Sequence, residues 1–560
     1  MPRDTFARIS RRATLAGMAG GTALAALPDL ARAHDIPSNP VFRHGVASGD
    51  PDANSVVLWT RVTADGPVRV HWDISGSPDF AKILQSGDFA TDASRDYTVK
   101  VLPAGLEPGA TYYYRFRLDE TVSPTGRTRT LPAGRLDRLG IALASCSNYP
   151  FGFFNAYDAI AHDADVDFVL HTGDYIYEYG ADEWGAETGR AIGRLHEPAN
   201  EIVSLSDYRT RHAQYKTDAG AQAMHAAHPL LACWDDHESA NNPWTAGAQN
   251  HQRDKEGDWV ARRASSVRAY FEWMPVREPI AGRTRMQFWR GYSFGDLAML
   301  HTLETRHTAR AKQIDYMEWV DKLKSPDDVA KFRKDVLDAP GRSMLAPELE
   351  ADLSRALSAS VSTGQPWRLI GNPMPIARTD VPDVVKLGIL PDPEGDLNAS
   401  FPAKALAWKG KWNLPFYPDT WDGYPWARER LYDLSRKAGA GDLVFLTGDS
   451  HSFWANRLAD AKGSSAGIEI GTAGISSPGD FASSGFGPVI SRKLDQAFAE
   501  NIDEVLWTDN MHQGYVRIDL TKTSGLASYV AVDTLESPYY RTATIKRLAF
   551  RRAGSSVEFT

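Results

Sequence analysis

Two stretches of the sequence share one plan, in which an apolar strand runs directly into Thr-Gly-Asp. The first is FVLHTGDYIYEYG at residues 168–180, and the second is LVFLTGDSHSFWAN at residues 443–456. Short apolar runs of this kind are typical of buried strands, and a glycine lets the backbone turn sharply where the strand ends. The repeat therefore predicts that two separate strands deliver Asp174 and Asp449 to a single site.

Strands and helices alternate from about residue 138 onwards. LGIALASCS, VDFVLHTGD, PLLACWDDHE, WRLIGNPMP and DLVFLTGDS have strand-like patterns, with helical stretches such as FFNAYDAIAHD and WARERLYDLSRKAG between them. This alternation predicts an α/β fold with a sheet covered on both faces. Ligands of such folds bind beyond the carboxyl ends of the strands, so we expect the site there.

The regions on either side of this α/β core have different patterns. Residues 38–133 contain short strands rich in β-branched and aromatic residues, which predicts an N-terminal all-β sandwich domain. LPAGRLDRLG is predicted to link it to a catalytic domain over residues 138–535. The C-terminal segment 536–560 is predicted to be either a lid over the site or a final strand.

Residues 1–33 have the three parts of a twin-arginine signal peptide: Arg11-Arg12, a mildly apolar stretch and an Ala-x-Ala cleavage site. They predict a partner in the twin-arginine export machinery and a periplasmic or secreted mature chain; a basic N-terminal helix is the alternative. No later apolar run reaches the roughly 18 residues of a transmembrane helix. The net charge of −9 gives no sign of a nucleic-acid-binding surface.

Side chains that bind metals follow four of the predicted strands. They are Cys146 and Asn148, then Asp174 and Tyr177, then Asp235, Asp236, His237, Asn241 and Asn242, and finally Asp449 and His451. Carboxylates gathered in one place repel each other unless cations neutralise them, which favours a metal site. Oxygen ligands suit calcium, whereas imidazole and thiolate suit a transition metal. A site with more than one metal ion is suited to phosphate ester hydrolysis.

These segments resemble the PhoD-type alkaline phosphatase and phosphodiesterase family of the metallophosphoesterase superfamily. The resemblance rests on HGVASGDP, SVVLWTRV, SCSN, HTGDYIYEYG, WDDHESANN and LTGDSHSFWAN, in the family's order, and spans residues 40–530. It implies a four-layer α/β/β/α core that contains ferric iron (Fe3+) and calcium (Ca2+). It also implies hydrolysis of a phosphate ester substrate by metal-activated hydroxide attack on phosphorus.

The resemblance further implies roles for single residues. The iron ligands would be Cys146, Asp174, Tyr177 and His451. The calcium ligands would be Asp174, Asn242, Asp449 and one member of the pair Asp235 and Asp236. His237 is expected to transfer a proton or to support a ligand, and Tyr175 and Tyr179 are expected to pack.

Arginine is the usual partner of phosphate oxygens, because its planar fork matches them. Arg194 is the favoured candidate, from its resemblance to the family's Arg-x-His-x-Pro stretch, and Arg190 and Arg306 are the others. For each, a surface salt bridge is the alternative. Two positions depart from the family: Glu304 stands where aspartate is expected, and Asn372 is predicted either to line the pocket or to cap a turn.

The first functional hypothesis is an exported alkaline phosphatase. The alternatives are a phosphodiesterase of phospholipase D type, which would act on phospholipids or polymeric phosphodiesters, and a non-catalytic metal- or phosphate-binding protein. A disulfide between Cys146 and Cys233, the two cysteines of the chain, would remove the thiolate ligand.

Overall fold

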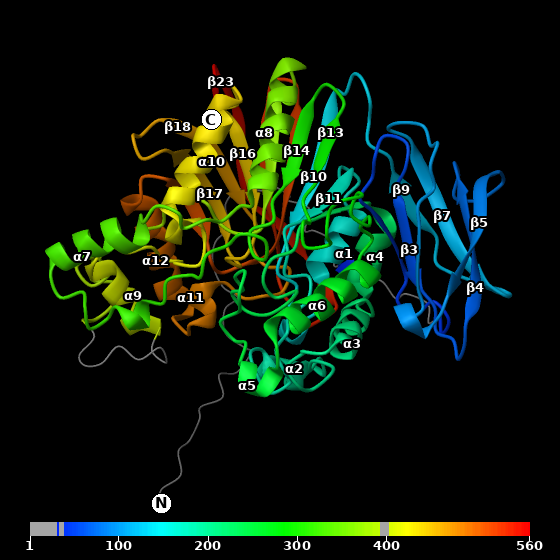
Figure 1. The fold of residues 1–560 in the computed structure, drawn as a ribbon, viewed down its shortest axis with the longest axis horizontal. Helices are drawn as coiled ribbons and strands as arrows, with labels where there is room; N and C mark the ends of the chain where they lie inside the picture. The colour runs from blue at the N-terminus through cyan, green and yellow to red at the C-terminus, as the bar shows by residue number, and fades with distance from the viewer. Residues whose placement is uncertain (1–30, 33–38, 393–401) are drawn as a thin grey trace, which may run out of the picture.

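The computed structural model describes residues 31–32, 39–392 and 402–560 (Figure 1). The predicted export signal therefore lies outside the described residues, except for β1 (Ala31–Arg32), which pairs with β22 (Tyr539–Tyr540). Within the described ranges, no helix has the length and apolar character needed to cross a membrane.

Two large sheets form the centre of the molecule. The ten-stranded sheet has the order β24 (Ser556–Phe559), β23 (Thr542–Ala553), β21 (Gly525–Val532), β20 (Gln513–Thr521), β10 (Arg138–Ala144), β11 (Phe168–His171), β12 (Leu230–Ala232), β2 (Val46–Gly49), β3 (Val57–Arg61) and β6 (Thr98–Val101). The seven-stranded sheet has the order β13 (Gly291–Phe294), β14 (Ala298–Thr302), β15 (Trp367–Asn372), β16 (Leu443–Thr447), β18 (Ser465–Gly471), β17 (Phe453–Ala459) and β19 (Val505–Asp509). The strands that carry the predicted ligands, β10, β11, β12 and β16, are parallel to their neighbours β11, β12, β2 and β18.

The two sheets pack face to face through a buried apolar core. Leu143 and Leu170 of the ten-stranded sheet belong to the same cluster as Leu369 and Val444 of the seven-stranded sheet. The predicted four-layer α/β/β/α arrangement is therefore confirmed. Each sheet is covered on both faces, but only one of these faces is covered by helices, because the other packs against the second sheet.

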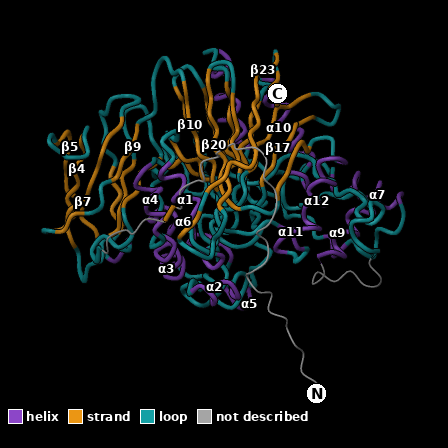
Figure 2. The backbone as a smooth tube through the Cα atoms, turned by 180° about the vertical axis from the view of Figure 1, so that it is seen from behind, coloured by secondary structure: helices purple, strands orange, loops and turns teal. Residues whose placement is uncertain are grey.

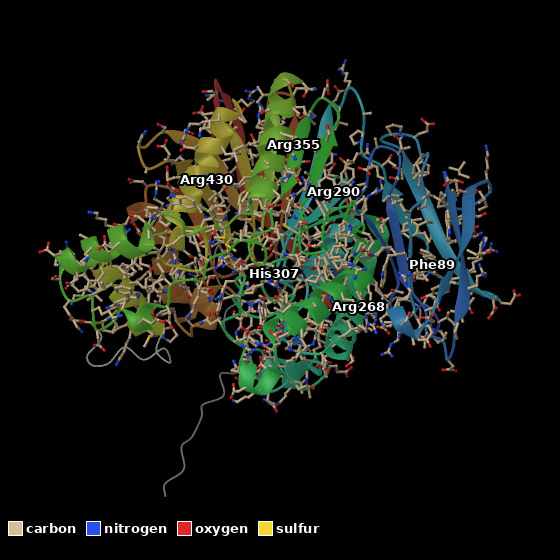
Figure 3. All side chains as sticks on the ribbon, in the orientation of Figure 1. Phe89, Arg268, Arg290, His307, Arg355 and Arg430 are labelled. Atoms are coloured by element: carbon tan, nitrogen blue, oxygen red, sulfur yellow. The ribbon has the colours of Figure 1, made fainter. Side chains whose placement is uncertain are left out.

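Helices form the two outer layers. The ten-stranded sheet is covered by residues of α1 (Asn155–His162), α4 (Ala219–Ala227) and α6 (Trp259–Trp273), which Figure 2 shows beside β10 and β20. The seven-stranded sheet is covered by α8 (Pro347–Ser362) and α10 (Pro425–Lys437). On the outer surface, Arg430 of α10, which is labelled in Figure 3, pairs with Glu350 of α8 at 2.6 Å. Further helices are α2 (Ala186–Ile192), α3 (Leu205–Tyr215), α5 (Arg253–Glu256), α7 (Pro326–Phe332), α9 (Pro402–Lys411), α11 (Asp480–Ser483) and α12 (Gly487–Asn501).

The N-terminal region is a β-sandwich that shares a sheet with the core. A separate sheet contains β4 (Val68–Ser75), β5 (Ile83–Thr91), β7 (Thr111–Leu118), β8 (Thr121–Val122) and β9 (Gly126–Arg129). It packs against β2, β3 and β6 through a cluster that includes Val46, Leu58, Val70 and Tyr114. Because β2 pairs with β12, these three strands continue the ten-stranded sheet and cover an edge that would otherwise be open.

At the opposite edge of that sheet lies the C-terminal segment. Residues 542–553 form β23, which pairs antiparallel with β21, and residues 556–559 form β24. Of the two alternatives for residues 536–560, strand pairing thus accounts for most of the segment.

One buried lysine joins the N-terminal strands to the helical layer. Lys216 follows α3, and its Nζ lies 2.7 Å from His225 Nε2. The same Nζ lies over the rings of Trp59 on β3 and Tyr175, at 5.1 and 4.8 Å from their centroids. Burial holds the pKa of Lys216 well below its ordinary value, which favours the neutral amine in the folded protein.

The substitution Lys216→Met is expected to stabilise the fold at neutral pH. Methionine keeps the apolar volume and requires no loss of a proton on folding. A lysine that is neutral when folded and charged when unfolded makes stability rise with pH, by up to about 1.4 kcal/mol per pH unit between its two pKa values. Urea unfolding of both proteins from about pH 6 to about pH 9 measures the slope, and the slope of the methionine variant should be smaller by the contribution of Lys216. Equal slopes would mean that Lys216 is charged when buried.

Candidate metal centre

Each predicted ligand loop begins where a strand ends. Cys146 follows β10, Asp174 follows β11, Asp235 and Asp236 follow β12, and Asp449 follows β16. Parallel strands place their carboxyl ends at one edge, so residues that are far apart in the sequence meet there. The two large sheets contribute jointly, since β16 belongs to the seven-stranded sheet and the other three strands to the ten-stranded sheet.

The glycines before Asp174 and Asp449 are required because the strand ends approach each other closely. A Cβ on Gly173, where φ is +107°, would lie 2.4 Å from the backbone nitrogen of Asp235. A Cβ on Gly448 would lie 2.2 Å from Ser145 Oγ. Any larger residue would therefore push apart the loops that carry the acids.

Backbone strain is concentrated at the same positions. Five predicted ligands have left-handed backbone angles, with φ of 60°, 56°, 48°, 64° and 53° for Cys146, Asp174, Asn242, Asp449 and His451. Non-glycine residues rarely adopt this conformation, and it persists only where the surrounding structure imposes it. The packing of the two sheets thus holds these side chains in orientations that the chain would not choose locally.

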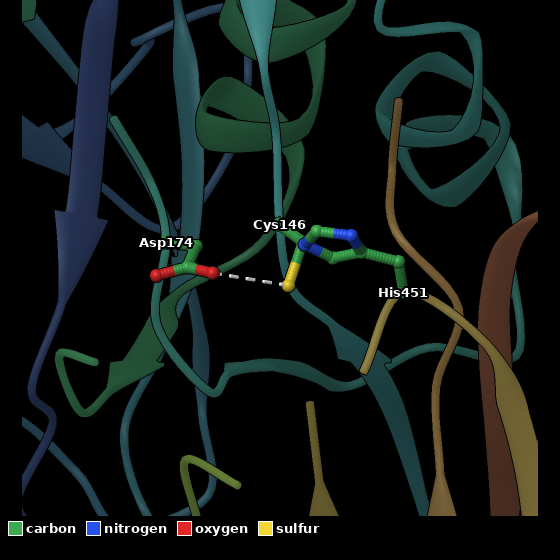
Figure 4. A group of neighbouring side chains, drawn as sticks. All are labelled: Cys146, Asp174 and His451. Atoms are coloured by element: carbon green, nitrogen blue, oxygen red, sulfur yellow. Dashed lines mark hydrogen bonds between the residues drawn. The ribbon is translucent and has the colours of Figure 1, made fainter. Parts of the chain in front are cut away.

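Asp174 is the residue shared by three groups of potential ligands. The groups are Cys146, Asp174 and His451, then Asp174, Asp236 and His237, and then Asp174, Asp235, Asp236 and Asp449, with ligand atoms within 4.8 Å of one another in each. Figure 4 shows the first group, in which Cys146 Sγ lies 3.4 Å from Asp174 Oδ2. The Tyr177 hydroxyl lies 3.2 Å from Asp174 Oδ2 and 3.1 Å from His451 Nε2. The structure therefore brings together all four side chains that the sequence predicts around iron.

Arg306 lies among the remaining acids. Its guanidinium donates to both oxygens of Asp235, at 2.5 and 2.9 Å, and to Asp449 Oδ1 at 3.3 Å. It also donates to Asn242 Oδ1 at 3.3 Å. Asp236 is different: its Oδ2 accepts from the Asn242 backbone at 2.9 Å, while its buried Oδ1 has no hydrogen-bond partner among the described residues.

The electrostatics of the cluster favour a bound cation. Burial, together with the charges of Asp236 and Asp235, raises the pKa of Asp174 well above its ordinary value. Burial and the charge of Asp174 raise the pKa of the Cys146 thiol and of the Tyr177 phenol in the same direction. Cations among these groups would favour their anionic forms and relieve the repulsion.

His237 lies beside this cluster and is held by an acid and an aromatic ring. Its Nδ1 lies 2.6 Å from Glu178 Oε2, and its ring stacks on Tyr177 with centroids 4.2 Å apart. Burial acts to lower the pKa of His237, but the charges of Asp236 and Glu178 outweigh it and raise the pKa to about 9. The ring is therefore fixed in position, and the neighbouring carboxylates favour its protonated form.

Arg194, the favoured phosphate-binding candidate, lies in a different environment. Its Nη2 donates to Asp218 Oδ2 at 2.9 Å, and its guanidinium lies 3.7 Å from the centroid of the Tyr149 ring. Both partners of this ion pair are buried, so it is not the surface salt bridge considered as the alternative either. Arg190 pairs with Asp182 at the surface. Among the three arginines, the one in contact with the predicted metal ligands is Arg306.

Glu304 and Asn372 have structural roles, and the two cysteines are not bonded to each other. Glu304 caps its own loop, since it accepts hydrogen bonds from the backbone nitrogens of Arg306, His307 and Thr308. Asn372 caps a turn by donating to the Met374 carbonyl at 2.5 Å. Cys146 and Cys233 are both free, so the disulfide alternative is not realised in the structure.

Two buried acids that support the site were not singled out from the sequence. Glu238 joins two of the loops, because it accepts from the Tyr175 nitrogen at 2.7 Å and from the Asp235 nitrogen at 2.8 Å. Glu178 orients His237. Both occur inside the quoted motifs, yet an acid that accepts backbone hydrogen bonds has the same sequence pattern as a solvent-exposed one.

Comparisons with known proteins agree with this architecture. Residues 141–529 match the PhoD-like phosphatase family, and residues 29–132 match its N-terminal domain. The chain is 34% identical over 519 residues to alkaline phosphatase D of Bacillus subtilis (strain 168), which covers 89% of this chain and 78% of the relative. A solved structure of PhoD superposes with a TM-score of 0.75 at 29% identity, covering 94% of this chain and 93% of that chain.

Fold, site and matches together define a phosphoric ester hydrolase. The chain belongs to the PhoD-like phosphatase family.

The buried pairs Arg306–Asp235 and Arg194–Asp218 allow a matched test of whether a cation binds among the acids. Removing Arg306 leaves buried acids without their internal cation, whereas removing Arg194 leaves a single acid outside the cluster. Each alanine variant should lose about 3 kcal/mol of stability when chelators are present. Calcium in excess should restore most of this loss in Arg306→Ala but not in Arg194→Ala, as measured by urea unfolding. Equal recovery in the two variants would contradict the placement of a cation among the acids.

Proposed function

We propose that this hydrolase is an exported alkaline phosphatase that releases phosphate from monoesters and uses ferric iron and calcium. The observation that carries the proposal is the sharing of Asp174 by a thiol–phenol–imidazole group and by a group of carboxylates. Two neighbouring groups of different ligand chemistry suit two different ions bridged by one carboxylate. When bound, such ions supply Lewis acidity for the phosphoryl oxygens and lower the pKa of the attacking water.

The iron would be held by Cys146, Asp174, Tyr177 and His451. The contacts of these side chains with one another lie between 3.1 and 3.4 Å. His451 is oriented by its Nδ1, which lies 3.2 Å from the Pro478 carbonyl and leaves Nε2 free to act as a ligand. Thiolate, phenolate and carboxylate together balance the charge of a trivalent ion.

Calcium would be held by Asp174, Asp449, Asn242 and Asp236. We prefer Asp236 to Asp235 because Asp235 is already paired through both oxygens with Arg306. Asp236 Oδ1 accepts no hydrogen bond from the described residues and has Arg306 Nη2 at 3.7 Å, which leaves it available as a calcium ligand.

Two side chains of this protein would act on the substrate directly. Arg306 would hold a phosphoryl oxygen through Nη1, because its Nε and Nη2 already donate to Asp235, whereas Nη1 makes a longer contact of 3.3 Å with Asn242 Oδ1. His237 would give its proton to the leaving alcohol, with Glu178 fixing the ring. Export rests on the Arg11-Arg12 motif and the Ala-x-Ala site in residues 1–33.

The decisive experiment combines metal analysis with hydrolysis of para-nitrophenyl phosphate and of bis(para-nitrophenyl) phosphate. The mature protein should contain iron and calcium, and it should cleave the monoester faster. Chelation should abolish the reaction, and added metal should restore it. Asp174→Asn should lower kcat/KM by at least about 100-fold and should reduce the metal content.

Asp442→Asn is the matched control, because Asp442 is equally buried but pairs with Arg368 and Arg552 instead of the cluster. Its metal content should equal that of the unmodified protein. Cleavage confined to the diester would favour the phosphodiesterase of phospholipase D type. A metal-loaded protein without either activity would favour the binding protein.

A further inference from the structure

An aromatic side chain that the proposed chemistry does not use lies directly over the predicted iron ligands. Trp184 is half-buried in the loop before α2. Its ring is stacked on that of His451, with centroids 5.5 Å apart and an interplanar angle of 19°. It also lies 5.7 Å from the ring of Tyr177. Trp184 therefore covers the metal centre on the side of these two ligands.

Two more half-buried rings continue this surface. Phe151 meets the edge of Trp184 with centroids 4.8 Å apart, and Tyr179 does so at 5.9 Å. The ring of Tyr179 in turn lies 5.3 Å from that of His237. Phe151, Tyr179 and Trp184, which we call the aromatic platform, thus extend from His451 to the proton donor proposed for the leaving alcohol.

The local backbone is shaped to bring this platform together. Gly185 has φ of +93°, and a Cβ there would lie 3.0 Å from Phe151 Cε2 and 3.0 Å from Pro150 Cβ. A larger residue would force the Trp184 loop away from Phe151. The contact between loops that begin after different strands is therefore built into the fold.

We propose that the aromatic platform binds the alcohol part of the substrate, and that the preferred monoesters contain a planar unsaturated ring. The proposal rests on the proposed phosphatase function, because it assigns the leaving group to the side of His237. A flat ring in the alcohol would pack against the partly exposed rings and would remove apolar surface from water. An aliphatic alcohol offers no such surface and would gain little from the platform.

Two kinds of monoester present such a ring, and they differ in its distance from phosphorus. In an aryl phosphate the ring is attached to the ester oxygen, whereas in a nucleoside monophosphate a sugar separates the two. Trp184 contacts two of the predicted iron ligands, His451 and Tyr177. The platform therefore lies close to the ester bond that breaks. We therefore expect the aryl ester to depend more strongly on Trp184 than the nucleotide.

The test uses the full metal-loaded protein and measures kcat and KM for para-nitrophenyl phosphate, adenosine monophosphate and glycerol phosphate. Trp184→Leu keeps apolar volume without a ring, and Trp184→Phe keeps a ring. The leucine variant should raise KM for para-nitrophenyl phosphate roughly three- to tenfold, with kcat little changed. KM for glycerol phosphate should stay within about twofold, and phenylalanine should recover most of the lost affinity.

Trp319→Leu serves as the matched control, because Trp319 is also half-buried and packs on an aromatic neighbour, Phe332, with centroids 4.7 Å apart. It should leave all three KM values unchanged. The iron content of each variant is measured alongside. If Trp184→Leu lowered kcat for every substrate together with the iron content, Trp184 would only support His451, and the proposal would be overturned.

A second measurement needs no variant. Phenylphosphonate should inhibit the unmodified protein roughly three to ten times more strongly than methylphosphonate, and equal inhibition would overturn the platform. Failure of the proposed function is distinguishable, because the unmodified protein would then not hydrolyse glycerol phosphate or para-nitrophenyl phosphate at all. In that event the dissociation constants of the two phosphonates still show whether the platform binds a ring.

Discussion

The structure depends on the gathering of buried carboxylates at one edge of two sheets. Asp174, Asp235, Asp236 and Asp449 are brought within a few ångströms of one another; the first three are buried and Asp449 is partly exposed. Removing each charge from water costs several kcal/mol, and their mutual repulsion adds to this cost. Arg306 offsets part of it, through its pairs with Asp235 and Asp449 and a longer ion pair with Asp236 at 3.7 Å. The rest of the fold must therefore hold these acids together against their repulsion.

In the α/β/β/α arrangement, the packing of the two sheets against each other stabilises the fold against this repulsion. The apolar core between the sheets places β11 and β16 face to face, so that their ends meet from opposite sides. Gly173 and Gly448 permit backbone contacts that no other residue would allow. The left-handed conformations of the ligands are then imposed by the packed sheets, which is how a folded core stores strain at a functional site.

The same principle extends to residues outside the predicted ligand set. Glu238 ties the Asp174 loop to the Asp235 loop through backbone hydrogen bonds. The N-terminal strands add their own support, because β2 pairs with β12, the strand that precedes the Asp235–Asp236 pair. One layer of the sandwich, β2, β3 and β6, is therefore a continuation of the ten-stranded sheet, whereas its other layer is a separate sheet.

The sequence by itself determined the alternation of strands and helices, the strand ends after Thr-Gly, and the residue types that gather there. These are local properties, which the periodicity of apolar residues and the positions of glycines indicate. Only the tertiary structure decided that Arg306 and not Arg194 joins the acids, because each arginine finds its partners from strands and loops distant in the chain. It likewise separated Asp235 from Asp236, since neighbouring side chains point in different directions and meet different partners. Contacts between distant segments cannot be predicted from the local sequence pattern. The chemistry of this site depends on such contacts.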